Sequence, residues 1–289
     1  MRWGRMTRSS RPRRFGSVAA LVLMLGLTAC VPRSYVSLGD SYTAGPLIPN
    51  QNQSPAGCLR SDHNYPHLIA PSLALPAFRD VSCSGAETED MTSAQGVTPG
   101  PNPPQFNALD QATEVVTLGI SGNDIGFSEI VENCSSPTPT GTPCQDRYVV
   151  DGRDEISERI AATAPKVAAV LQGIRSRSPR ADMFVVGYPT ILPDTGNGCW
   201  PQMPVTSGDV PYLRAKEKEL NAMLAAQAAA NGAVYVDTYT PSIGKDACQL
   251  PTVRWVEPVV PVNPAAPVHP NARGMAGMAA VVLAAIRAG

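Results

Sequence analysis

The chain has 289 residues, of which 43% are hydrophobic and 16% charged, and its formal net charge is −1. This composition is typical of a globular protein with a sizeable core and excludes an intrinsically disordered chain. Residues 1–29 hold six arginines and no acidic residue, so the rest of the chain is acidic, with 17 basic against 24 acidic residues. An acidic remainder without a basic patch argues against a nucleic-acid partner.

Residues 1–29 have the layout of a signal peptide. Arginines precede the apolar run "FGSVAALVLMLGLTA" (15–29), which is too short to span a membrane comfortably. The adjacent Arg13 and Arg14 leave open whether export uses the Sec or the twin-arginine route. The run ends in "LTAC", which resembles the bacterial lipobox, so we expect cleavage before Cys30 and lipidation of that cysteine. The alternative is ordinary cleavage after Ala29, although Leu27 is bulky for such a site.

We therefore expect an exported protein, either anchored by lipid at the outer face of the cytoplasmic membrane or secreted. Besides Cys30 the chain has an even number of cysteines, which suggests three disulfides in an exported protein. They are Cys58, Cys83, Cys134, Cys144, Cys199 and Cys248. Six cysteines permit 15 pairings, and their spacing does not choose among them. There is no CxxC pair, so we expect no zinc site, no other metal and no cofactor.

Apolar, β-rich runs alternate with helical patterns along the remainder of the chain. Strands are predicted at 35–39, 78–83, 114–121, 181–188 and 232–239, and helices at 154–178, 210–232 and 271–288. This alternation favours a single α/β domain over 30–289, a three-layer α/β/α sandwich around a parallel sheet of about five strands. Proline-rich stretches at 96–106 and 257–270 predict ordered surface loops over the strand ends.

Four short stretches fall where strands or loops should meet at one edge of the sheet. They are "GDSY" with Ser41, "CSGA" with Gly85, "SGND" with Asn123 and "PVHPN" with His269. An acyl-transfer site needs a nucleophile, a base and donors for the oxyanion. Ser41, His269, the Gly85 backbone N–H and the Asn123 amide would supply these groups.

These four blocks, in this order, resemble the SGNH (GDSL) hydrolase superfamily over about residues 34–288, and in particular the secreted esterases and lipases of actinomycetes. The resemblance implies the flavodoxin-like α/β/α fold and a carboxylic ester hydrolase that forms an acyl-enzyme on Ser41 with His269 as general base. It implies an oxyanion hole made by the backbone N–H groups of Ser41 and Gly85 and by the Asn123 side chain. It also implies the sequential disulfides Cys58–Cys83, Cys134–Cys144 and Cys199–Cys248. The expected partner is a lipid or small acyl ester, and the expected oligomeric state is a monomer.

One position departs from the commoner family pattern. Many members have an aspartate three residues before the histidine, where this chain has Ala266. We therefore expect a Ser41–His269 dyad in which the carbonyl of Ala266 accepts the Nδ1 proton, since the imidazole needs an acceptor that fixes its tautomer. Asp237 and Asp246 are the alternative acceptors, and Asp40 is expected to be a structural hydrogen-bond acceptor.

One other fold with the same chemistry and two other functions compete with this interpretation. The α/β-hydrolase motif G-x-S-x-G is not met at Ser41, because Thr43 occupies the second glycine position. A non-catalytic surface binding lipoprotein would have no need to keep the nucleophile, the base and the oxyanion donors together. A deacylase of envelope glycans would use the same site, and the sequence does not separate it from a lipase.

Overall fold

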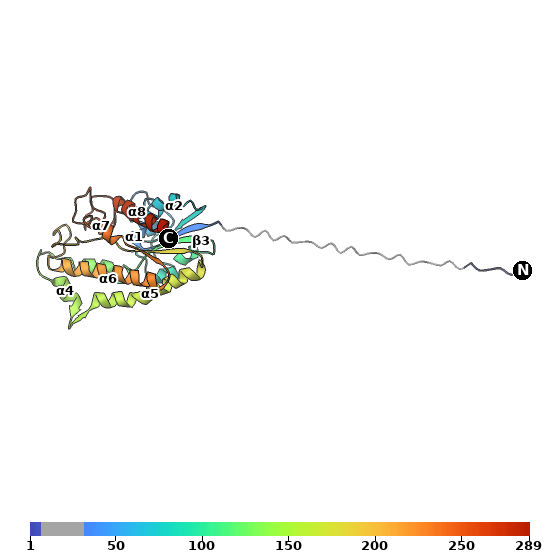
Figure 1. The fold of residues 1–289 in the computed structure, drawn as a ribbon, viewed down its shortest axis with the longest axis horizontal. Coiled ribbons are helices and arrows are strands. Elements are labelled where there is room, and N and C mark those ends of the chain that lie inside the picture. Colours follow the sequence, from blue (N-terminus) through green and yellow to red (C-terminus); the bar gives the residue numbers. More distant parts are fainter. Residues whose placement is uncertain (7–31) are drawn as a thin grey trace. The chain divides into compact units, whose positions relative to one another are not determined.

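The computed structural model describes residues 1–6 and 32–289, and residues 32–289 form one folded unit (Figure 1). Most of the predicted signal peptide and the predicted lipidation site Cys30 lie outside the described residues. Within the described part of the chain, none of the helices is both long and apolar enough to cross a membrane.

A five-stranded parallel sheet forms the centre of this unit, as predicted. Its strands are β1 (Ser34–Gly39), β2 (Ala77–Asp80), β3 (Thr113–Gly119), β6 (Asp182–Val186) and β7 (Val234–Val236). Their order across the sheet is β2-β1-β3-β6-β7, so the chain runs outward from β1 to β2 and then returns past β1 to β3. The direction of winding thus reverses between β1 and β3, and open α/β sheets place their ligand sites beside this switch point, at the carboxyl ends of the strands.

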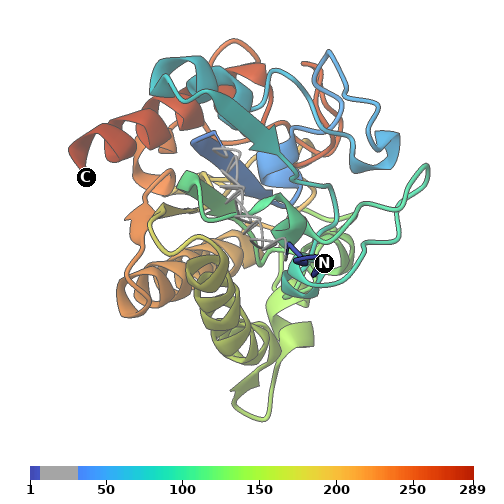
Figure 2. The same ribbon diagram turned by 90° about the vertical axis from the view of Figure 1, so that its right-hand side faces the viewer.

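Helices cover both faces of the sheet, which makes the three layers (Figure 1, Figure 2). Helices α2 (Tyr65–Leu73) and α8 (Ala272–Ala288) pack on one face, and α5 (Glu155–Arg177) and α6 (Asp209–Ala230) pack on the other. Successive side chains of a strand point to opposite faces of the sheet. Phe184 therefore packs with α2 and α8, whereas Val185 packs with α5 and α6. Both faces of the central strands are buried, which is why β1, β3 and β6 are largely apolar, whereas the edge strand β2 is only partly buried and ends in Arg79 and Asp80.

Shorter elements carry the connections. They are α1 (Ser41–Ala44), η1 (Ala56–Cys58), η2 (Thr88–Met91), η3 (Gln105–Ala108), α3 (Phe127–Asn133), α4 (Pro143–Tyr148), α7 (Tyr239–Ser242) and the small hairpin of β4 (Val149–Val150) and β5 (Arg153–Asp154). The two proline-rich stretches are irregular apart from the start of η3, as expected for ordered loops.

Three disulfides fasten these connections to one another: Cys58–Cys83, Cys134–Cys144 and Cys199–Cys248. They are the sequential pairs that the family resemblance implies. Each bridge restricts the unfolded chain, a contribution of typically about 2–4 kcal/mol. The first two bridges lie next to the segments that carry Gly85 and α3, so they hold the surroundings of the candidate site.

Candidate active site

Ser41 lies directly beyond the carboxyl end of β1, at the first residue of the short helix α1. Gly39 permits the sharp exit from the strand, because its φ is +153° and an added Cβ would lie 2.5 Å from the carbonyl oxygen of Gly119. Asp40 then caps α1 by accepting a hydrogen bond from the backbone N–H of Tyr42, at 2.9 Å. This turn presents the Ser41 hydroxyl at the edge of the sheet.

His269 reaches the same point from the loop before α8. Its Nε2 lies 2.8 Å from Oγ of Ser41, and its Nδ1 lies 2.7 Å from the carbonyl oxygen of Pro267. A carbonyl oxygen can only accept, so Nδ1 carries the proton and Nε2 is left to accept the serine hydroxyl. The structure thus brings Ser41 and His269 together in the geometry that a nucleophile and its general base require.

The prediction that Ala266 supplies the acceptor is wrong by one residue. The Ala266 carbonyl accepts the backbone N–H of His269 instead, at 3.2 Å, which closes a four-residue turn. Pro267 occupies the second position of this turn and Val268, with φ +58°, the third, as in a type II turn. This turn occupies the carbonyl of Ala266, so the carbonyl of Pro267 is the one that accepts the hydrogen bond from the imidazole.

Val268 is a strained residue, since a β-branched side chain rarely adopts a positive φ. Two contacts hold the turn in place. The Tyr42 hydroxyl donates to the Val268 carbonyl at 2.6 Å, and the backbone N–H of Glu257 donates to the His269 carbonyl at 3.0 Å. Tyr42, the residue after the nucleophile, therefore also fixes the segment that carries the base.

Glu257 anchors the rest of this loop. Its buried carboxylate accepts hydrogen bonds from Arg254, Asn263 and Asn271 and from the backbone N–H of Val262. Burial raises the pKa of Glu257, but these donors outweigh it and lower the pKa to about 2. The loop over 257–270 is thus tied to an ionised carboxylate that the sequence analysis did not single out.

The predicted oxyanion donors lie at the ends of the neighbouring strands. Gly85 has φ +80°, and Asn123 donates one amide hydrogen to the carbonyl of Ala86 at 2.8 Å, which links the two segments. The second amide hydrogen of Asn123 remains for a ligand. Within residues 32–289, no hydrogen bond engages the backbone N–H of Ser41 or of Gly85. These donors are therefore available to an oxyanion.

Tyr188, which follows β6, connects the nucleophile to the oxyanion segment. Its hydroxyl donates to Asp40 at 2.6 Å and accepts the backbone N–H of Gly122 at 2.7 Å. Burial raises the pKa of Asp40 to about 7, although the hydrogen bonds from Tyr188 and Tyr42 lower it. Asp40 is thus the structural acceptor that was expected, whereas its partner Tyr188 was not foreseen.

The other candidate carboxylates bind elsewhere. Asp237 accepts the backbone N–H of Thr240 at the start of α7, and Asp246 accepts hydrogen bonds from Cys248 and Gln249. In the part of the chain that the structure describes, neither is hydrogen-bonded to His269. Burial lowers the pKa of the half-buried His269, and the hydrogen bond to Pro267 raises it in part. A neutral imidazole suits a general base.

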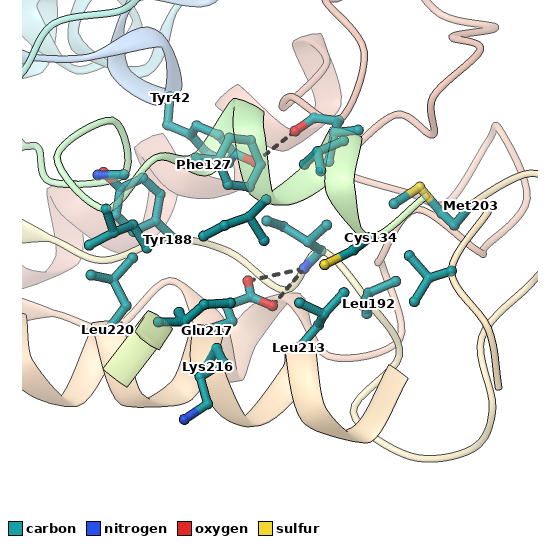
Figure 3. A pocket seen from close by; sticks show the side chains of 18 of the residues that line it. Tyr42, Phe127, Cys134, Tyr188, Leu192, Met203, Leu213, Lys216, Glu217 and Leu220 are labelled. Atoms are coloured by element: carbon teal, nitrogen blue, oxygen red, sulfur yellow. Dashed lines mark hydrogen bonds between the residues drawn. The ribbon is translucent and has the colours of Figure 1, made fainter. Parts of the chain in front are cut away.

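An apolar pocket of about 100 Å³ opens beside Ser41 (Figure 3). Tyr42, Phe127 and Tyr188 form its end near the nucleophile. Its further walls come from α3, from the loop after β6 and from α6, and include Ile130, Val131, Cys134, Leu192, Met203, Leu213 and Leu220. The side chain of Glu217 projects from α6 toward this pocket (Figure 3). The lining of this pocket is suited to an apolar group.

Comparisons with known proteins agree with this geometry. The sequence model of the GDSL-like lipase/acylhydrolase family matches residues 37–276. The chain is 40% identical to Lipase 2 of Streptomyces coelicolor over 263 residues, which cover 84% of this chain and 86% of the relative. It is 30% identical to a lipase of Streptomyces rimosus over 247 residues, covering 82% and 85% of the two chains.

Solved structures give the same picture. The fold is similar to that of phospholipase A1 from Streptomyces albidoflavus, with a TM-score of 0.73 and 25% identity over 89% of this chain and 99% of the other. It is also similar to the extracellular lipase of Streptomyces rimosus, with a TM-score of 0.71 and 26% identity over the same shares of the two chains.

Proposed function

The chain belongs to the GDSL-like lipase/acylhydrolase family and is a carboxylic ester hydrolase, and we propose that it works through an acyl-enzyme on Ser41 with His269 as general base. The observation that carries this proposal is the 2.8 Å contact between Oγ of Ser41 and Nε2 of His269, beside an apolar pocket. Relatives of this chain named lipase and phospholipase A1 favour a lipid or other acyl ester as the substrate.

The reaction follows from the geometry of these two residues. Oγ of Ser41 attacks the acyl carbon while Nε2 of His269 takes the hydroxyl proton, which gives a tetrahedral oxyanion and an imidazolium. The imidazolium returns its proton to the alcohol oxygen as the ester C–O bond breaks, and the acyl group stays on Ser41. A water molecule then attacks the acyl-enzyme by the same proton path and releases the carboxylic acid.

Two sets of donors support the charges that develop. The backbone N–H groups of Ser41 and Gly85 and the free amide hydrogen of Asn123 would bind the oxyanion. The Pro267 carbonyl would hold the imidazole and its positive charge through Nδ1. A neutral carbonyl stabilises an imidazolium less than a carboxylate does, so this dyad relies more on the oxyanion donors.

Turnover of a p-nitrophenyl butyrate ester tests this function. Ser41→Ala and His269→Ala should each lower kcat by about 10⁴-fold or more, and the double variant should lose little beyond that, because the pair acts as a unit. The exposed Ser93→Ala is the matched control and should keep wild-type turnover. No turnover by the folded wild type on any ester would instead favour a non-catalytic binding lipoprotein.

A substrate panel separates a lipase from a glycan deacylase. The apolar lining beside Ser41 favours esters with an alkyl acyl chain, so p-nitrophenyl octanoate, an acylglycerol and a phospholipid should be hydrolysed faster than an acetylated sugar. Preference for the acetylated sugar would favour the deacylase.

We also propose that Cys30, which lies outside the described residues, carries the lipid anchor. Two or more acyl chains on this cysteine would make anchoring stable, because one chain binds a membrane only marginally. In cells that express Cys30→Ala, the enzyme should move from the membrane fraction to the soluble fraction. A variant that stays in the membrane fraction as the wild type does would contradict the anchor.

A further inference from the structure

The apolar pocket beside Ser41 contains a carboxyl group that the reaction does not use. Glu217 lies on α6, between Leu213 and Leu220, and its side chain projects toward the pocket on the side away from Tyr42 (Figure 3). Its carboxyl oxygens lie 3.1 and 3.3 Å from the backbone N–H of Ile191, which donates to them. A carboxyl group among aliphatic side chains is costly to keep and needs an explanation.

No cation neutralises this group within residues 32–289. The two lysines that flank it in sequence bind elsewhere: Lys216 pairs with Asp154 and Glu219, and Lys218 pairs with Asp194. Burial raises the pKa of Glu217 well above its ordinary value, and the hydrogen bond from Ile191 opposes this only in part. Burial without a neutralising cation thus favours the neutral form of Glu217, which one backbone donor holds.

We propose that Glu217 forms the floor of the acyl pocket and sets the longest acyl chain that the enzyme accepts. This inference rests on the proposed function, since it places the acyl chain of the substrate in the pocket beside Ser41. A pocket of about 100 Å³ has room for several water molecules at roughly 10–15 Å³ each, which corresponds to a short or medium acyl chain.

The physical reason is that a long acyl chain desolvates the carboxyl group of Glu217 at the floor of the pocket. A short chain leaves water between its end and the carboxyl group, whose free hydrogen-bonding positions then stay satisfied. A chain that reaches Glu217 expels this water and leaves the hydrogen-bonding positions that Ile191 does not fill without a partner, and such an unsatisfied buried position typically costs about 1–3 kcal/mol. Below that length each added methylene gains about 0.8 kcal/mol, or roughly fourfold in kcat/KM. Activity should therefore rise with chain length and then fall sharply.

The test is the profile of kcat/KM over p-nitrophenyl acetate, butyrate, octanoate, laurate and palmitate. Glu217→Ala removes the floor and should move the maximum of kcat/KM to longer acyl chains. The ratio of kcat/KM for laurate to that for butyrate should rise at least about tenfold, which corresponds to the gain from two added methylenes. Glu217→Gln keeps the size and a neutral polar end, so it should keep the wild-type maximum. Glu219→Ala is the matched control, because Glu219 lies on the same helix, does not line the pocket, and binds Ser157 and Lys216.

Melting temperatures establish that each variant is folded, and Glu217→Val replaces the alanine variant if that one does not fold. An unchanged chain-length profile in a folded Glu217→Ala or Glu217→Val enzyme would overturn the inference. So would a Glu217→Gln enzyme whose maximum moves as far as that of the alanine variant. Failure of the proposed function has a different signature, since the wild type would then hydrolyse none of these esters.

Discussion

Nδ1 of His269 donates to the carbonyl oxygen of Pro267, 2.7 Å away and only two residues earlier in the chain. A single turn therefore both carries the base and supplies the group that fixes its tautomer. Glu257 anchors this loop in two ways: its backbone N–H donates to the carbonyl of His269, and its carboxylate accepts the backbone N–H of Val262. The acceptor here is the neutral carbonyl of Pro267. The rigidity of the segment that presents it takes the place of the negative charge of a carboxylate.

If the dyad is complete, the carboxylates considered as alternatives are dispensable. Asp237→Asn and Asp246→Asn should each retain most of kcat/KM, because both side chains bind backbone or amide groups away from His269. Steady-state kinetics on folded variants measure this. A loss of around 10⁴-fold in either, as removal of a triad aspartate can cause, would show that a carboxylate serves the histidine.

The pH dependence of kcat/KM should report His269. The base must be neutral to accept the serine proton, so activity is lost as the pH falls through its pKa. Burial lowers that pKa, so the acid limb should lie below pH 6.5. Asp40, with a pKa of about 7, is the neighbouring group that could mimic such a limb. Asp40→Asn should therefore leave the limb where it is; a limb that disappears in this variant would contradict its assignment to His269.

The oxyanion donors are tested by removing one amide. Asn123→Ala should lower kcat by about 10²–10³ with little change in KM, because the donor acts mainly in the transition state. Asn133→Ala is the control, since Asn133 binds Glu129 and Tyr148 on the far end of α3. A loss below roughly tenfold in the Asn123 variant would mean that its amide does not face the developing charge.

The raised pKa of Asp40 predicts that the stability of the fold depends on pH in an unusual way. In the folded state Asp40 has a pKa of about 7, whereas an aspartic acid ordinarily has a pKa of 3.8, so the folded state binds more protons between these pH values. Stability then falls as the pH rises through this window, by up to about 4 kcal/mol for this group. Asp40→Asn cannot ionise and escapes this loss.

Chemical unfolding of both proteins at several pH values measures the effect. The free energy of unfolding of Asp40→Asn, taken relative to the wild type, should rise steadily from pH 3.8 to pH 7. The comparison cancels the other carboxylates, which titrate in both proteins. A difference that stays constant across this window would show that Asp40 is not held protonated by burial.

The sheet, three of its four flanking helices and the four segments of the site were predictable because their signals are local, whereas no range was predicted for α2. Ser41 follows an apolar strand that ends in glycine, and α5 has acids in its first turn and arginines in its last. The strands predicted at 78–83, 114–121, 181–188 and 232–239 all end earlier in the structure, at Asp80, Gly119, Val186 and Val236. After Asp80 the backbone N–H groups of Val81 and Cys83 still donate to the carbonyls of Ser37 and Gly39, so the chain follows β1 beyond the end of the regular strand.

What the sequence could not predict depends on contacts between distant residues. Val268 takes a positive φ that normally marks glycine or asparagine, and this turn decides that Pro267, not Ala266, meets the histidine. Tyr188 contacts Asp40 across 148 residues. Glu217 sits in an ordinary polar helical pattern, and only the packing of α6 against the loop after β6 turns it toward the pocket.

The central claim is that Ser41 carries the acyl group during turnover, and covalent labelling tests it most directly. The wild-type enzyme should react with a fluorophosphonate to give one adduct per chain by intact mass, with activity lost in proportion. Peptide mapping should place that adduct on Ser41, and Ser41→Ala should remain unlabelled. An adduct on any other residue, or ester hydrolysis that persists in a Ser41→Ala enzyme at the wild-type rate, would contradict the account.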